Sequence, residues 1–171
     1  YTFLKAQGME VGASLLEADK LDVAKEILNV ARAKGVTFLL PMDHVIAEKA
    51  EVTAVTRTAD STAIPPGWMG LDIGPRAREA FATVIRGAKT VVWNGPMGVF
   101  EKKPFDAGTV AVAKAVASSG ALSVVGGGDS EKAVKSAGVA DKISHISTGG
   151  GASLEFLSGL VLPGVAALSE K

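Results

Sequence analysis

The sequence contains no cysteine. This absence excludes disulfides and thiolate metal sites, and it is compatible with the cytoplasmic location that we expect. Acidic and basic residues balance at 18 each. Neither a polyanion-binding surface nor an acidic tail is therefore indicated, and we expect no nucleic-acid partner. Long apolar runs are also lacking, because Pro163 and Gly164 interrupt the apolar end of the chain, so we expect no membrane span.

The length of 171 residues suits one domain with an ordinary hydrophobic core, and 47% of the residues are hydrophobic. The chain opens without an initiator Met, in a stretch typical of the middle of a helix that ends at Gly8. We therefore expect a piece of a longer protein, and the lack of a targeting signal says little about that protein.

Apolar strand-like segments alternate with helical ones along the chain, as in proteins built from βαβ units. This pattern predicts an α/β fold, a Rossmann-like three-layer sandwich with a mainly parallel sheet and helices on both faces. The predicted strands cover 36–40, 90–93, 122–125 and 143–146, with a β-rich excursion over 45–64; the predicted helices cover 21–34, 75–86, 107–118, 131–137 and 152–157.

The most informative loop follows the strand predicted at 122–125 and consists of three glycines, Asp129 and Ser130. Glycines let the backbone approach a ligand closely, and the free N–H groups of the following helix favour an anion such as phosphate. A carboxylate beside a phosphate needs a cation between them, so Asp129 predicts a nucleotide bound with Mg²⁺. The alternative is an ordinary glycine-rich turn.

Two more loops at predicted strand ends carry unusual sequences. Residues 147–151 again lead from a strand through three glycines into a helix, so two helix N-termini would face one space. Residues 94–101 place Asn94 and Glu101 beside the apolar Pro96 and Val99, which suits a ribose and a base. The alternative is a turn with a solvated glutamate.

Several better-known motifs are missing. The sequence has neither a P-loop nor the glycine fingerprint of dinucleotide-binding domains. His44 and His145 stand apart from any carboxylate or cysteine spacing, so we interpret both as structural residues. No Ser-His-Asp set can be proposed.

Together these segments resemble the signature sequences of the phosphoglycerate kinase family. The likeness is carried by 92–101, 126–130 and 147–155, in the order and spacing of the family, and extends to 67–75 and 162–168. The resemblance implies that residues 1–171 are the C-terminal, nucleotide-binding domain, truncated at its N-terminal side. It also implies that the tail 162–171 returns to an N-terminal domain that is absent here and that holds 3-phosphoglycerate.

The resemblance further implies roles for individual residues. Those expected at the nucleoside are Glu101 on the ribose, Pro96 and Val99 along the nucleoside, and Leu15 and Leu71 facing adenine. Those expected at the phosphates are Asn94, Gly127, Gly128, Asp129 and Ser130, with Asp129 holding Mg²⁺, and Gly149, Gly150 and Gly151 facing the phosphoryl group in flight. A Gly-Gly-Ala-Lys segment of the family, whose lysine contacts the phosphates, has no counterpart in this sequence.

The implied reaction is the reversible transfer of a phosphoryl group from 1,3-bisphosphoglycerate to ADP, which gives 3-phosphoglycerate and ATP in glycolysis. We expect this chain alone to be inactive, with Mg²⁺ entering together with ADP or ATP. A non-catalytic nucleotide-binding α/β module is the alternative function. An oxidoreductase is disfavoured because the dinucleotide fingerprint is missing.

Overall fold

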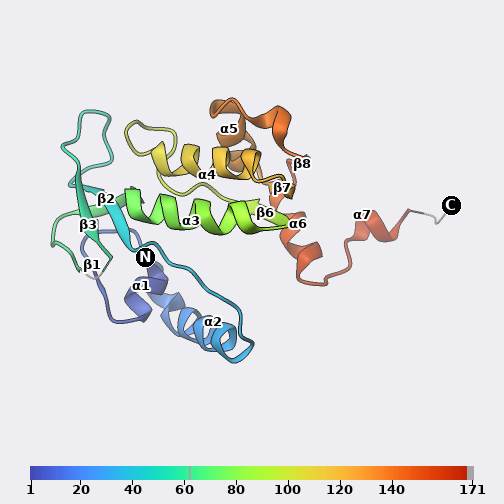
Figure 1. Ribbon diagram of the computed structural model, residues 1–171. Coiled ribbons are helices and arrows are strands. Elements are labelled where there is room, and N and C mark those ends of the chain that lie inside the picture. Colours follow the sequence, from blue (N-terminus) through green and yellow to red (C-terminus); the bar gives the residue numbers. More distant parts are fainter. Residues whose placement is uncertain (62, 169–171) are drawn as a thin grey trace. The chain divides into compact units, whose positions relative to one another are not determined.

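The computed structural model describes residues 1–61 and 63–168 (Figure 1). By their contacts these residues form two compact units. Unit 1 comprises Tyr1–Val84 and Met97–Val112, and unit 2 comprises Ile85–Pro96 and the described chain from Ala113 onward. Helices α3 (Pro75–Gly87) and α4 (Ala107–Ser118) each run from one unit into the other.

Unit 1 contains a mainly antiparallel arrangement of strands. The strands β2, β3 and β5 form a sheet in the order β3-β2-β5, with antiparallel pairing throughout, and the short strands β1 and β4 pair in parallel. The elements of this unit, besides parts of α3 and α4, are α1 (Thr2–Ala6), β1 (Glu10–Val11), the 3-10 turn η1 (Ala18–Lys20), α2 (Leu21–Ala33), β2 (Asp43–Ala47), β3 (Arg57–Asp60), β4 (Ala63–Ile64) and β5 (Met69–Ile73).

The hydrophobic core of unit 1 gathers around β2 and β5. Ala47, Leu71 and Phe105 are buried together, and Val45 and Val99 pack against them. Helix α1 lies beside α2 (Figure 1). The small residues Ala24 and Ala31 are buried on α2, whereas the larger Val23, Ile27 and Val30 remain exposed on the same helix.

The prediction of a strand at 36–40 is wrong. This segment adopts no regular secondary structure, and Val36, Phe38 and Leu39 are 58%, 39% and 47% exposed. An apolar run has the composition of a buried strand, but a strand forms only where another strand offers hydrogen-bonding partners. Within the described chain no strand pairs with this run.

Unit 2 is built on a parallel sheet with the strand order β6-β7-β8. Helix α5 packs against β7 and β8, as Figure 1 shows in orange. The elements are β6 (Thr90–Asn94), β7 (Leu122–Gly126), α5 (Gly128–Ser136), the 3-10 turn η2 (Ala140–Lys142), β8 (His145–Ser147), α6 (Gly150–Leu157) and α7 (Pro163–Ala166).

The predicted α/β fold with a parallel sheet and helices is confirmed. The helix predicted at 107–118 matches α4 to the residue, and the other predicted helices match α2, α3, α5 and α6 within a few residues. The described strands, however, pair in three sheets instead of one continuous sheet. No helix of the described chain is long and apolar enough to cross a membrane. The tail predicted at 162–171 begins with α7, and its residues 169–171 lie outside the described part.

Candidate functional site

The carboxyl ends of the three strands of unit 2 lie in one row. Asn94 is the register partner of Gly126, and Gly126 is the register partner of Ser147. Because the strands are parallel, the loops that leave these three residues emerge at the same edge of the sheet. Sheet register thus brings together the loops predicted at 126–130 and 147–151 and the first residues, 94–96, of the loop predicted at 94–101, whose remaining residues belong to unit 1.

The two glycine loops touch each other directly. The N–H of Gly127 donates a 2.9 Å hydrogen bond to the carbonyl of Ser147, and Gly127 has a φ of 95°, a conformation that favours glycine. A Cβ placed on Gly150 would lie only 2.8 Å from the Cα of Gly127. A side chain at residue 150 would therefore force the two loops apart, and glycine is required there for their close approach.

Two side chains fasten the third loop to this pair. The side-chain amide of Asn94 donates a 2.9 Å hydrogen bond to the carbonyl of Gly126. The N–H of Gly95 donates a 2.7 Å hydrogen bond to the hydroxyl of Ser130, which is 1% exposed. The indole N–H of Trp93 donates to the carbonyl of Gly95 at 2.7 Å. The loop after β6 is therefore held at several backbone and side-chain positions.

Helices α5 and α6 begin at this edge of the sheet without a side-chain cap. Their N-cap residues are Gly127 and Gly149, and neither N-terminus receives a side-chain cap hydrogen bond. Uncapped N–H groups and the helix dipole leave partial positive charge at both ends. An anion such as a phosphate is the ligand that such ends favour.

Asp129 lies in the first turn of α5, and its side chain is 59% exposed. Its carboxylate forms an ion pair with Lys132 at 3.0 Å. Among the described residues there is no group of three histidine, cysteine or acidic side chains that could hold a metal ion. A single accessible carboxylate fits Mg²⁺, which is commonly bound by one or two carboxylates together with the phosphates of a substrate.

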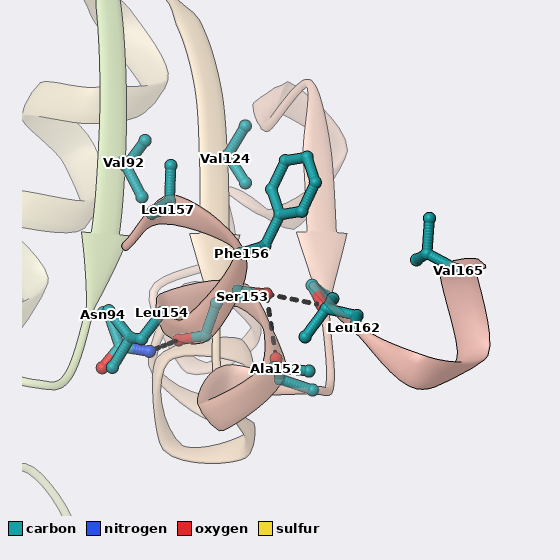
Figure 2. Close-up of a pocket in the computed structure, with 13 residues that line it drawn as sticks. Val92, Asn94, Val124, Ala152, Ser153, Leu154, Phe156, Leu157, Leu162 and Val165 are labelled. Atoms are coloured by element: carbon teal, nitrogen blue, oxygen red, sulfur yellow. Dashed lines mark hydrogen bonds between the residues drawn. The ribbon is translucent and has the colours of Figure 1, made fainter. Parts of the chain in front are cut away.

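A cavity of about 540 Å³ adjoins the glycine loops in unit 2 (Figure 2). Figure 2 shows Phe156 and Leu157 of α6 facing Val124 and Val92 of the strands. The remaining lining residues are Asn94, Gly126, Ser147, Gly149, Ala152, Ser153, Leu154, Leu162 and Val165. The wall of this cavity is thus mostly apolar, and its polar groups come from the three loop-bearing strand ends and from Ser153. Asp129 and Ser130 are not part of the lining.

The residues predicted at the nucleoside, apart from Pro96, belong to unit 1. Leu71 is buried, Val99 packs against the cluster that contains Leu71, and the N–H of Val99 donates a 2.9 Å hydrogen bond to the carbonyl of Leu71. Leu15 is 91% exposed, and Glu101 is exposed as well. The structure therefore brings Leu71 and Val99 together and leaves the side chains of Leu15 and Glu101 accessible. Pro96 follows the loop of β6 in unit 2.

The sequence interpretation passed over Asp72, which lies in β5 next to Leu71 and is 1% exposed. Burial raises the pKa of its carboxyl to about 6, although hydrogen bonds from Gly108 and Ile73 and the charge of Arg78 act in the opposite direction. The signal available in the sequence was a lone acid between apolar residues, because such a position requires buried partners. Ile73 and Arg78 lie close to Asp72 in the sequence, whereas Gly108 lies 36 residues away and could not be named beforehand.

The sequence model of phosphoglycerate kinase matches residues 1–160. The chain is similar to the phosphoglycerate kinase of Acidobacterium capsulatum, with 62% identity over 173 residues that cover 100% of this chain and 43% of that protein. It is also 58% identical to the chloroplastic phosphoglycerate kinase of Volvox carteri over 174 residues, which cover 100% of this chain and 38% of the relative.

Solved structures give the same result. The phosphoglycerate kinase of Coxiella burnetii superposes with a TM-score of 0.92 at 42% identity, covering 96% of this chain and 43% of that one. The enzyme of Pyrococcus horikoshii superposes with a TM-score of 0.82 at 34% identity, covering 98% and 42%. The chain thus spans less than half the length of these relatives. With a family match over nearly its whole length and relatives above 60% identity, the chain belongs to the phosphoglycerate kinase family.

Proposed function

We propose that this chain is the nucleotide-binding half of a phosphoglycerate kinase and binds MgADP and MgATP. In this proposal residues 1–171 form the C-terminal domain, and the tail 162–171 returns to the N-terminal domain. The full-length protein transfers a phosphoryl group between 1,3-bisphosphoglycerate and ADP, which gives 3-phosphoglycerate and ATP. The phosphoglycerate substrates bind through the part of the protein outside this chain.

One observation carries the proposal: the uncapped N-termini of α5 and α6 begin at adjacent, mutually contacting glycine loops. Gly127, Gly128 and Ser130 then surround the nucleotide phosphates, with Asn94 beside them. Gly149, Gly150 and Gly151 face the phosphoryl group as it moves. Phosphoryl transfer depends mainly on positioning and on neutralising negative charge, which backbone N–H groups can supply without a nucleophilic side chain.

Asp129 is the residue that would hold Mg²⁺ in this arrangement. When bound with the nucleotide, the ion neutralises charge on the phosphate oxygens. The accessible carboxylate of Asp129 can reach such an ion once it releases Lys132, with which it forms an exposed ion pair. Exposed pairs of this kind contribute little free energy, about 0.3–0.5 kcal/mol on a helix, so this exchange is inexpensive.

The nucleoside contacts rest on the family resemblance. Glu101 binds the ribose hydroxyls, Val99 and Pro96 lie along the nucleoside, and Leu15 and Leu71 face adenine. The exposed carboxylate of Glu101 supports its part of the proposal, because it makes no hydrogen bond or ion pair within the described chain.

The chain alone is expected not to catalyse the transfer. Enzymatic acceleration requires at least about 8 kcal/mol of transition-state stabilisation, whereas one helix N-terminus supplies about 0.3–1 and at best about 2 kcal/mol. The remainder comes from the bound ion and from basic residues elsewhere in the full-length protein, as that protein closes over its substrates.

A coupled assay tests the function. The full-length protein is expected to turn over ADP and 1,3-bisphosphoglycerate, the 171-residue chain to give background, and addition of the N-terminal half to restore part of the activity. Nucleotide binding without turnover by the full-length protein would favour the alternative, a non-catalytic nucleotide-binding module. Robust turnover by the chain alone would show that the catalytic charge is misplaced in this proposal. The cytoplasmic location stays a prediction, since the relative from Volvox carteri is chloroplastic.

A further inference from the structure

The buried carboxylate of Asp72 accepts hydrogen bonds from three donors in unit 1. Its Oδ1 accepts from the N–H of Ile73 at 2.8 Å. Its Oδ2 accepts from the N–H of Gly108 at 2.6 Å and from the guanidinium of Arg78 at 3.1 Å. Gly108 lies in the first turn of α4, so Asp72 also caps that helix through a group distant in sequence.

Strand β5 also contacts the chain at Gly98 and Val99, ten and nine residues before Gly108. The carbonyl of Leu71 accepts the N–H of Val99, and a Cβ on Gly98 would lie 2.6 Å from that carbonyl and 2.7 Å from the Asp72 carboxylate. A Cβ on Gly108 would lie 2.2 Å from the same carboxylate. Only glycine fits at both positions, so the segment 98–108 is fastened at its two ends to Leu71 and Asp72.

Between these two ends lie the residues that the proposed function needs. Val99 packs against the cluster of Leu71 and Phe105, while Glu101 extends into solvent. Inside the segment, the fully buried Phe105 packs in the core cluster with Ala47 and Leu71. The other contacts are local backbone hydrogen bonds that close its turns and a hydrogen bond from Lys102 to the carbonyl of Ala50. Val99 and Glu101 therefore lie between the packing of Phe105 and the two hydrogen-bonded attachments of the segment to β5, one at Leu71 and one at Asp72.

We propose that Asp72 is a positioning residue for nucleotide binding, because its carboxylate holds the segment 98–108 that carries Val99 and Glu101. This inference rests on the proposed function. A carboxylate is suited to the task because it only accepts hydrogen bonds and can serve three donors at once. An asparagine would turn an N–H group toward one of those donors and release it.

Asp43 provides a matched control in the same unit. It is also 1% exposed, and its carboxylate accepts the N–H groups of Arg76 and Ala77 at 3.1 and 2.8 Å. It pairs with the Arg76 guanidinium at 3.6 Å, and a Cβ on Gly74 would contact it. Asp43 thus caps α3 as Asp72 caps α4, but in the described chain its carboxylate makes no hydrogen bond to the segment 98–108.

The experiment compares Asp72→Asn with Asp43→Asn in the full-length protein. Both variants are expected to unfold at lower temperature than the wild type. Only Asp72→Asn is expected to raise the Kd and KM for MgADP, by roughly tenfold. This is the effect expected if the hydrogen bonds to the Asp72 carboxylate no longer hold the segment that carries Val99 and Glu101. The KM for 3-phosphoglycerate is expected to be unchanged in both. An equal rise of the MgADP Kd in both variants, or no rise in Asp72→Asn, would overturn the inference.

Hydrogen exchange in the wild-type protein decides the matter if Asp72→Asn does not fold. MgADP is expected to slow exchange at the N–H groups of Val99 and Gly108, and to leave that of Ala77 unchanged. Equal protection at all three, or none, would overturn the inference. Wild-type protein that fails to bind MgADP would overturn the proposed function as well, whereas wild-type binding with an unaffected Asp72→Asn variant would overturn the positioning role alone.

Discussion

The buried hydroxyl of Ser130 accepts a hydrogen bond from the backbone N–H of Gly95, which lies 35 residues earlier in the chain. This contact joins the first turn of α5 to the loop after β6. Within unit 2 it holds together two loops, one after β6 and one at the start of α5, that are far apart in the sequence. Removal of this hydrogen bond is therefore expected to lower the stability of the protein even in the absence of a ligand.

Ser130→Ala is expected to lower the free energy of unfolding by about 1–3 kcal/mol, because the N–H of Gly95 is left without its acceptor. Urea denaturation measures the change. Ser118→Ala is the control, since that exposed hydroxyl only bonds back to its own helix and its loss is expected to change stability by less than about 0.5 kcal/mol. Equal effects of the two substitutions would contradict the fastening role.

Asp129→Asn is expected to weaken binding of MgADP far more than binding of metal-free ADP, because the side chain loses the charge that holds the ion. Calorimetric titration of the full-length protein with the two forms of the nucleotide measures this. Glu131→Gln is the control, as Glu131 lies in the same first turn but pairs with Lys135. If Asp129→Asn weakens both forms equally, the Mg²⁺ assignment is wrong.

Glu101→Ala is expected to reduce the preference of the full-length protein for ADP over 2′,3′-dideoxy-ADP. A hydrogen bond to a charged group contributes about 1.5–3 kcal/mol, so the preference is expected to fall at least about tenfold. Competition binding measures the two affinities. Glu51→Ala, which removes an exposed acid elsewhere in unit 1, is expected to leave the preference as it is. An unchanged preference in Glu101→Ala would make Glu101 an ordinary solvated residue.

The stability of the chain is expected to depend on pH through His44. Burial lowers the pKa of this imidazole to about 4, and its two nitrogens lie 3.0 Å from the Ser61 hydroxyl and 3.2 Å from the Tyr1 hydroxyl. Between pH 4 and 6.5 the unfolded chain binds the proton more readily than the folded one, so the free energy of unfolding falls as the pH falls through this window.

Denaturation of the wild type and of His44→Gln at a series of pH values isolates this effect. The wild type is expected to lose stability more steeply than the variant between pH 6.5 and 4. The raised pKa of Asp72 acts with the opposite sign, since folding then favours the protonated acid, but it is present in both proteins and cancels in the difference. Parallel curves for the two proteins would contradict the assignment to His44.

The helices of this chain could be predicted because their sequence patterns are local. The helix at 107–118 matches the structure to the residue. Strand β5 was not predicted, since Gly70 and Asp72 interrupt its apolar pattern and one of the donors to Asp72, the N–H of Gly108, lies 36 residues along the chain. The segment 36–40 failed in the opposite way: its composition is that of a strand, but composition does not reveal whether a neighbouring strand exists.

The candidate site was predictable to the same degree. The loops at 126–130 and 147–151 could be identified because each has glycines directly before the start of a helix. The residues that make a helix N-terminus suitable for an anion are adjacent in the sequence. The direct contact of Gly127 with Gly150 and the bond from Asn94 to Gly126 depend on strand order, which no local pattern specifies.

The exposed run at 36–40 has a practical consequence for work with the isolated chain. Thr37–Leu40 make no backbone hydrogen bonds within the described residues, and Val36 and Leu39 are 58% and 47% exposed, while Phe38 also contacts the ring of Phe3. Such a segment is a template on which a second molecule can add a strand, and β-branched and aromatic residues strengthen that tendency. We therefore expect concentrated solutions of the 171-residue chain to self-associate at this segment, and we expect a lysine in place of the exposed Leu39 to oppose this without removing the contact of Phe38 with Phe3.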